Sequence, residues 1–378
     1  MKIGIITLPP YANYGGILQA YALQSVLQDM GHEVCVLVNE HKFYKPTKEE
    51  YVKRTILKLL GKNIIIRAEK KTEKEAPLIF GKLWNFIDTY IHKCKISRFE
   101  DLEACQLDAI VVGSDQVWRP IYFQELWRCP IQNAFLSFSE NWNIKRIAYA
   151  TSLGVDQWEY SKEQTQKCRK YAQRFNAISV REKSAVGLLE DNFAVNPEFV
   201  LDPTMLLSID KYKNLFKNIH LKTHKNGLLN YILDNDDRKR DIVNGFAKAK
   251  SLEAFSVTNT MVESAAPVEE RIMPSVEAWL KGFYDAEFVV TDSFHACVFS
   301  ILFRKPFVAI GNAARGMGRF RSLLETFGLE DHLCCSEKQI DYARDYSIPD
   351  KVYLILEDLR RKSLDFLQDS LTDNNILV

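Results

Sequence analysis

The stretch from residue 286 to residue 312 constrains the fold most, because it reads as a strand, a polar turn, a helix and a second strand in close succession. The apolar run 288–290 precedes the polar turn 291–295, and apolar runs over 296–303 and 306–310 follow it. Such a βαβ unit predicts an α/β fold with parallel strands. Ligands of open α/β sheets bind beyond the carboxyl ends of the strands, which is where this turn lies.

The polar residues of this turn have two interpretations. A helix N-terminus offers unpaired N–H groups and a partial positive charge, so it suits an anion, and His295 in the first helical turn would face that ligand. Alternatively, Asp292 or Ser293 only caps the helix, and His295 is a structural histidine. For a histidine considered alone the second interpretation is favoured, so the first needs support from other segments.

Length and composition indicate two domains. The chain of 378 residues exceeds one typical core, and its 47% hydrophobic residues can fill two. The formal net charge of +1 gives no overall attraction to nucleic acid, so no nucleic-acid partner is expected. We find no signal-peptide pattern, no apolar run of membrane-spanning length and no CxxC pair among the eight cysteines. These features predict a cytoplasmic protein with free thiols.

The first half of the chain repeats the strand-and-turn layout. Apolar runs over 2–8, 107–112, 146–150, 177–180 and 199–201 each end in glycines or polar residues. Because the carboxyl ends of parallel strands meet at one edge of a sheet, this repetition predicts one functional edge. Each turn alone could equally be a tight turn or a cap. The candidate residues in these turns are Asn13, Tyr14, Gly15, Gly16, Ser114, Asp115, Gln116, Ser152 and Arg181.

The strand–helix rhythm restarts near Gly227, which places a soft domain boundary close to residue 204. We therefore expect an N-terminal Rossmann-like domain over 1–204 and a C-terminal one over 205–350. The remaining segment, 351–378, reads as a long closing helix that packs back on the first domain.

Residues 41–76 interrupt this rhythm with eleven Lys and Arg against five Asp and Glu. The pattern predicts an excursion with one or two helices. A solvated basic face is the simplest interpretation. The alternatives are contact with an acidic glycan and peripheral attachment to the inner face of the membrane.

Four groups of residues stand in the order found in a known family. They are 13–16 with 18–23, 112–118, 179–184 with 201–204, and 291–295. Together they resemble the polysaccharide pyruvyl transferase family over nearly the whole chain. The resemblance implies two Rossmann-like domains facing across a cleft, a GT-B-like α/β architecture with the acceptor on the first domain and the donor on the second.

The resemblance also implies an activity. Such a transferase moves a pyruvyl group from phosphoenolpyruvate to a sugar of a cell-surface polysaccharide and forms a ketal, a step of exopolysaccharide biosynthesis. Phosphoenolpyruvate is then a co-substrate, no other cofactor or metal is implied, and the acceptor is a sugar or a lipid-linked oligosaccharide. By the family pattern, His295 and Arg181 form the catalytic pair. Some members have an arginine where this chain has Ser293.

The residue types suit such a donor, which carries a phosphate and a carboxylate. Arg181 can clamp one anionic group, and Arg319 or Arg315 can meet the other. The alternatives are an ion pair with Asp202 for Arg181 and a solvated helix start for Arg319. For the whole chain, the alternatives are a sugar-nucleotide-dependent glycosyltransferase of the same fold and a non-catalytic glycan-binding protein.

Overall fold

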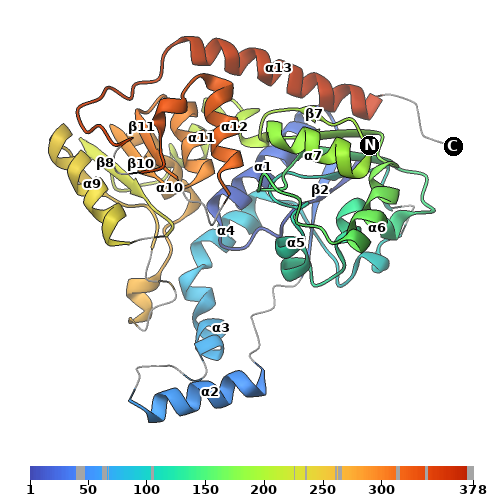
Figure 1. The fold of residues 1–378 in the computed structure, drawn as a ribbon, viewed down its shortest axis with the longest axis horizontal. Coiled ribbons are helices and arrows are strands. Elements are labelled where there is room, and N and C mark those ends of the chain that lie inside the picture. The colour runs from blue at the N-terminus through green and yellow to red at the C-terminus, as the bar shows by residue number, and fades with distance from the viewer. Residues whose placement is uncertain are drawn as a thin grey trace.

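Two parallel sheets organise the chain in the computed structural model (Figure 1). All strand pairings in both sheets are parallel, so the α/β class predicted from the sequence is confirmed, and the two-sheet arrangement is GT-B-like. The structure describes residues 1–39, 47–61, 66, 68–103, 106–224, 226–234, 236–259, 262, 266–311, 316–336 and 339–372. Arg315 and Cys105 lie outside these residues, and the seven described cysteines are free thiols.

The first sheet has seven strands in the order β3-β2-β1-β4-β5-β6-β7. Every residue of β4 is buried, which fits a parallel strand covered by helices on both faces. The strands are β1 (Lys2–Ile6), β2 (Glu33–Val38), β3 (Lys93–Lys95), β4 (Ala109–Val112), β5 (Lys145–Thr151), β6 (Ala177–Val180) and β7 (Glu198–Phe199). The helices that alternate with them are α1 (Tyr14–Asp29), α4 (Gly81–Tyr90), α5 (Pro120–Trp127), α6 (Lys162–Ala172) and α7 (Lys183–Phe193).

The second sheet has five strands in the order β12-β11-β10-β8-β9. It contains β8 (Gly227–Tyr231), β9 (Glu253–Phe255), β10 (Phe288–Thr291), β11 (Phe307–Ile310) and β12 (Leu333–Cys334). The helices of this half are α8 (Ile209–Phe216), α9 (Asp237–Lys250), α10 (Val276–Asp285), α11 (Phe294–Leu302) and α12 (Gly318–Phe327). The βαβ unit predicted around the polar turn is therefore β10-α11-β11. The strand expected over 255–257 lies two residues earlier, because β9 pairs with β8 at Glu253, Ala254 and Phe255.

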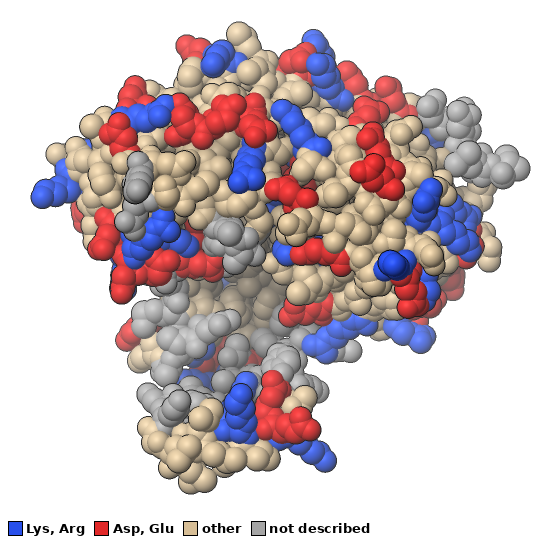
Figure 2. Space-filling view, viewed as in Figure 1, with Lys and Arg blue, Asp and Glu red and all other residues tan. Residues whose placement is uncertain are grey.

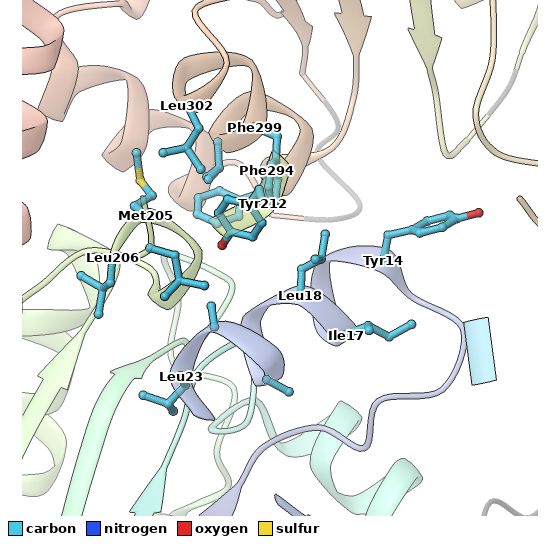
Figure 3. Packing of buried hydrophobic residues seen from close by; sticks show 14 of the residues in the cluster. Tyr14, Ile17, Leu18, Leu23, Met205, Leu206, Tyr212, Phe294, Phe299 and Leu302 are labelled. Atoms are coloured by element: carbon cyan, nitrogen blue, oxygen red, sulfur yellow. The ribbon is translucent and has the colours of Figure 1, made fainter. Parts of the chain in front are cut away.

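Hydrophobic side chains of both halves form one cluster, so the two sheets are packed against each other. Figure 3 shows side chains of α1 on one side of this cluster and side chains of α11 on the other. The ring centroids of Tyr14 of α1 and Tyr231 of β8 lie 6.4 Å apart. Tyr14 of α1 stacks on Trp279 of α10 at 5.6 Å. Burying apolar surface in this way stabilises the contact between the domains.

The closing helix α13 (Lys351–Thr372) runs back across the molecule to the first sheet (Figure 1). Lys145 Nζ of β5 donates to the carbonyl of Leu371 over 2.7 Å. The backbone N–H of Leu201 donates to Ser363 Oγ over 3.0 Å. The closing helix thus contacts the first domain through hydrogen bonds as well as through its apolar face.

The basic excursion forms two helices, α2 (Lys48–Leu59) and α3 (Ala68–Ile79), which Figure 1 shows below the body of the molecule. We call them the arm. Glu75 of α3 pairs with the buried Arg271, and the N–H of Met273 donates to the carbonyl of Ile79 over 2.8 Å. The prediction of one or two helices is correct for the described residues; 41–46, 62–65 and 67 lie outside them.

Candidate active site

The strand-end turns of the first sheet meet the start of α11 from the second. Ser114, Asp115 and Gln116 follow β4, Ser152 follows β5, and Arg181 follows β6. His295 is the second residue of α11, and Arg319 is the second residue of α12. All of these side chains are buried between the two domains. The fold explains this, since parallel strands bring their carboxyl ends to one edge.

Arg181 is the centre of this group and is paired with three carboxylates. Its Nη1 donates to Asp202 Oδ2 over 2.5 Å, its Nη2 to Asp115 Oδ1 over 2.8 Å, and its Nε to Glu182 Oε1 over 3.3 Å. A guanidinium that is 4% exposed needs such partners, because burial of an uncompensated charge is costly. In this conformation Arg181 makes the ion pair with Asp202 that the sequence left as an alternative, rather than presenting a free fork to an anion.

The pKa values of the ionisable groups around Arg181 reflect two opposing effects. Burial disfavours the charged forms, and neighbouring opposite charges favour them. Burial disfavours the charge on Arg181, but Asp115 and Asp202 hold its pKa above the ordinary value. Burial likewise opposes ionisation of Asp115 and Asp202, and Arg181 overcomes it, so both pKa values are lowered. The pKa of Glu182 is raised because burial outweighs the nearby cations. Ser152 Oγ donates to Glu182 Oε1 over 2.5 Å.

Arg319 brings a second guanidinium to the same buried site. Burial and the positive charge of Arg181 lower the pKa of Arg319 to about 10. Both cations lie near the ring of Phe294, whose centroid is 4.7 Å from Arg181 Cζ and 5.8 Å from Arg319 Cζ. The face of an aromatic ring attracts a cation, so Phe294 helps to hold both guanidiniums in place. Arg319 thus adds a second cation to a group in which Asp115 and Asp202 already balance the charge of Arg181.

His295 lies directly against the first domain. Its Nε2 is 3.8 Å from Asp202 Oδ2 and makes no hydrogen bond. Burial lowers the pKa of His295, while Asp202 and Asp115 act in the opposite direction. The imidazole is therefore neutral at neutral pH. A carboxylate beside it can stabilise the charge that appears when the imidazole takes up a proton.

Gly15 makes the approach of His295 possible. A Cβ atom at position 15 would lie 2.1 Å from His295 Nδ1, a separation that real atoms do not show. The neighbouring Gly16 has no such restriction, because a Cβ there would meet Asn13 at 3.7 Å. The glycine pair read from the sequence thus has one member whose missing side chain admits a residue from the other domain.

The capping prediction for α11 was wrong. Ser293 occupies the N-cap position, but its side chain makes no capping hydrogen bond. The Asp292 carboxylate instead accepts from the N–H of Leu233 over 2.7 Å and from Lys239 Nζ over 2.8 Å. With the N–H of Asp234 at 3.2 Å, three donors from the loop after β8 and from α9 satisfy that carboxylate better than a single helix N–H would.

Three other candidates make hydrogen bonds to residues outside the Arg181 group. Asn13 caps α1 by accepting from the N–H of Gly16 over 2.9 Å. The hydroxyl of Tyr14 donates to the carbonyl of Pro274 over 2.7 Å, so this residue joins the domains and does not reach the Arg181 group. Gln116 Oε1 accepts from Arg119 Nη1 over 3.2 Å.

The site also contains three residues that were not predicted from the sequence to belong to it: Asp202, Glu182 and Phe294. Each lies in one of the quoted turns, so the signal was present in their position. Asp202 could have been found from the turn after 199–201, because an aspartate there sits at the same sheet edge as Arg181. Thr204 fixes its orientation by donating from Oγ1 to Asp202 Oδ1 over 2.6 Å.

The two domains are closed on each other at this site. The cavity lined by Arg181, Asp202 and Phe294 has a volume of about 10 Å³, which suits one water molecule. The N–H of Lys183 donates across the boundary to Ser322 Oγ over 3.0 Å. A sugar or a phosphate ester is far larger than this cavity, which borders Arg181 on the side of Phe199 and Phe327.

A model of the polysaccharide pyruvyl transferase family matches residues 13–313, which is most of the chain. The chain therefore belongs to the polysaccharide pyruvyl transferase family and is a transferase, contrary to the alternative of a non-catalytic glycan-binding protein. No curated protein sequence matches it.

Solved structures that match the chain do so at low sequence identity. A glycosyltransferase from Rickettsia africae ESF-5 is 13% identical, with 99% of each chain covered and a TM-score of 0.45. A UDP-glucosyltransferase from Polygonum tinctorium is 9% identical, with 97% of each chain covered and a TM-score of 0.44. The UDP-GlcNAc 2-epimerase from Neisseria meningitidis is 11% identical, with 96% of this chain and 100% of that chain covered and a TM-score of 0.41.

Two properties of the described residues bear on metals and membranes. Within the described ranges, no group of three or more His, Cys, Asp or Glu side chains is arranged to hold a metal ion. No helix that the structure describes combines the length and the apolar composition needed to cross a membrane.

Proposed function

We propose that this enzyme transfers a pyruvyl group from phosphoenolpyruvate to a sugar of a cell-surface polysaccharide and forms a ketal across two of its hydroxyls. The observation that carries the proposal is the position of His295, neutral and 3.8 Å from Asp202, beside two buried guanidiniums. That arrangement places an acid–base group next to two guanidiniums, which are side chains suited to bind phosphate and carboxylate groups. The donor has both a phosphate and a carboxylate to place there.

The guanidiniums of Arg181 and Arg319, both next to the ring of Phe294, are the groups that bind the anion. Two desolvated guanidiniums repel each other, and an anion between them relieves that repulsion. The N-terminus of α11 adds backbone N–H groups aimed at the same region, and the Ser293 side chain does not occupy them. On this basis Arg319 contacts the donor, and Arg181 both contributes charge and holds Asp115 and Asp202 around His295.

The reaction needs protons moved in both directions. Protonation of the enol methylene makes C2 of the donor electrophilic, and the first sugar hydroxyl adds to C2 and gives up its proton. The bond from C2 to the phosphate oxygen then breaks, the second hydroxyl closes the ketal at C2, and its proton leaves with the departing inorganic phosphate. His295 can accept a hydroxyl proton at Nε2, and Asp202 stabilises the imidazolium that results. The site is buried, which keeps water from competing with the sugar.

His295→Ala should lower turnover by about 10²–10⁴-fold, the usual contribution of a general acid or base, while donor affinity is retained. His224→Ala is a matched control, because His224 stacks on Phe255 at the far edge of the second sheet. Ketal formation measured with phosphoenolpyruvate and calorimetric titration of that donor separate the two effects. Full turnover by His295→Ala would show that the histidine is structural.

The pH profile adds a second readout. Because burial lowers the pKa of His295 below 6.5, its neutral form persists at neutral pH and is lost only as the pH falls through that lowered value. The activity of the wild type should therefore decline on the acid side with a midpoint below 6.5, and the residual activity of His295→Ala should lack this decline. An acid limb that is identical in both proteins would assign it to another group.

A thermal-shift comparison tests the donor itself. Phosphoenolpyruvate should raise the melting temperature of the wild type, and Arg319→Ala should weaken that stabilisation. UDP, GDP and CMP serve as the competing ligands. Stabilisation by a nucleotide and none by phosphoenolpyruvate would favour the sugar-nucleotide-dependent glycosyltransferase instead.

A further inference from the structure

The helix α2 of the arm has an apolar surface that the described protein does not cover. All twelve residues of α2 are described, and none of them is buried. Its large hydrophobic side chains are strongly exposed, with Val52 at 59%, Ile56 at 51% and Leu59 at 82%, followed by Leu60 at 72%. Exposed apolar residues this close together indicate a surface that another phase or molecule covers.

Helical spacing gathers these residues on one face. Val52, Ile56 and Leu59 stand at positions i, i+4 and i+7, and Leu60 adjoins them, so they form one stripe along the helix. In a helix that packs on its own domain, such a stripe faces the core. Here Figure 1 shows α2 at the far end of the arm, so the stripe has a different use.

The helix holds its form by local contacts. The N–H of Thr47 donates to Glu50 Oε2 over 2.8 Å, and the N–H of Glu50 donates to Thr47 Oγ1 over 3.3 Å, which together make a capping box. The Arg271–Glu75 pair fixes α3, which joins α2 to the body. The arm thus presents an ordered amphipathic helix at a distance from the sheets.

The charged residues of α2 help to decide whether a second copy of the helix or a lipid surface covers the stripe. Lys48 and Lys53 flank it, and Glu49 lies at its N-terminal end. Arg54 and Lys58 lie on the opposite face, and the Glu50 carboxylate already serves the capping box. Lys48 and Lys53 lie on opposite sides of the stripe by helical geometry. Figure 2 shows both basic and acidic side chains on this lobe, beside uncharged surface. A second copy of α2 would bring like charges together, whereas an anionic lipid surface offers negative charge and an apolar interior at once.

We propose that α2 binds the protein to an anionic membrane surface, with its apolar stripe in the boundary between headgroups and acyl chains and its lysines among the headgroups. This inference is independent of the proposed reaction, because it rests on the arm and not on the site. The helix lies in the plane of the surface and does not span the bilayer. Both the apolar stripe and the basic flanks contribute to binding.

Co-sedimentation of the full chain with vesicles tests the proposal. We expect binding to vesicles of equal parts phosphatidylcholine and phosphatidylglycerol, weaker binding at high salt, and little binding to phosphatidylcholine alone. Replacement of Val52, Ile56, Leu59 and Leu60 by glutamine should abolish binding. Lys48→Gln and Lys53→Gln should each weaken it about fivefold. Leu354→Gln is the matched control, since Leu354 on α13 is 76% exposed but belongs to the body.

Two results would overturn the proposal. One is a wild type that stays in the supernatant with the mixed vesicles, or a glutamine variant that sediments as well as the wild type. The other is a concentration-dependent dimer, seen by analytical ultracentrifugation without lipid and removed by the glutamine variant, which would make a second copy the occupant. Because α2 contributes nothing to the core, circular dichroism should show that the variants remain folded.

Discussion

The candidate site buries its charged residues, whereas the arm leaves both charged and apolar residues exposed. In the site, Arg181, Glu182 and Asp202 are each no more than 4% exposed and lie between two packed domains. In the arm, the lysines of α2 and the side chain of Leu59 are exposed to solvent. The partners also differ, since Arg181 pairs with Asp115 and Asp202 from distant turns, whereas Thr47 and Glu50 pair within one turn.

This difference shows that a local motif and a buried ion-pair group become ordered in different ways. A local motif such as a capping box forms from neighbouring residues and needs no domain around it. A buried ion-pair group needs the whole sheet to bring its members together, and each member then depends on the others. Substitutions should therefore spread their effects through the site and remain local in the arm.

Arg181→Ala should have the largest effect. It leaves the carboxylates of Asp115, Asp202 and Glu182 buried without their shared cation, and removing one partner of a buried pair costs about 3–5 kcal/mol. Urea unfolding should show that loss in the free energy of unfolding. Arg361→Ala is the control, because the Arg361 side chain is 71% exposed in its pair with Asp358, and such pairs contribute about 0–1 kcal/mol. Equal losses in the two variants would contradict the ion-pair account.

Gly15→Ala should have an intermediate effect, on activity more than on stability. The added Cβ would meet the His295 ring at 2.1 Å and keep α11 from closing on α1. Small misplacements of a catalytic group can cost about 10²-fold in rate. Gly16→Ala, with its nearest contact at 3.7 Å, should leave turnover close to that of the wild type. Ketal formation by both variants measures the difference, and the same loss in both would show that His295 does not need this approach.

Ile56→Gln in the arm should have the smallest effect on folding. Surface substitutions away from special features change the free energy of unfolding by less than about 0.5 kcal/mol. Leu18→Ala in the shared core should instead cost about 2–5 kcal/mol, because it leaves a cavity among fully buried neighbours. Thermal and urea unfolding of the two variants gives both values. A cost for Ile56→Gln that approaches the one for Leu18→Ala would mean that α2 packs on the body.

The sequence alone indicated the α/β class, the βαβ unit around His295 and the strand-end position of most candidate residues. These inferences succeed because apolar runs, turns and helical periods are local patterns. The family resemblance follows from the order of four such turns, and the family match to residues 13–313 confirms it. The two helices of the arm were also local predictions.

The tertiary structure was needed to tell how these residues combine. Nothing local shows that Arg181 is shared by three carboxylates, because Asp115, Glu182 and Asp202 come from turns after different strands. Nor does the sequence reveal that Gly15 admits His295 from the other domain, or that Asp292 serves the loop after β8 instead of capping α11. The physical reason is that packing pairs side chains by distance in space, and that distance depends on how two whole sheets are placed against each other.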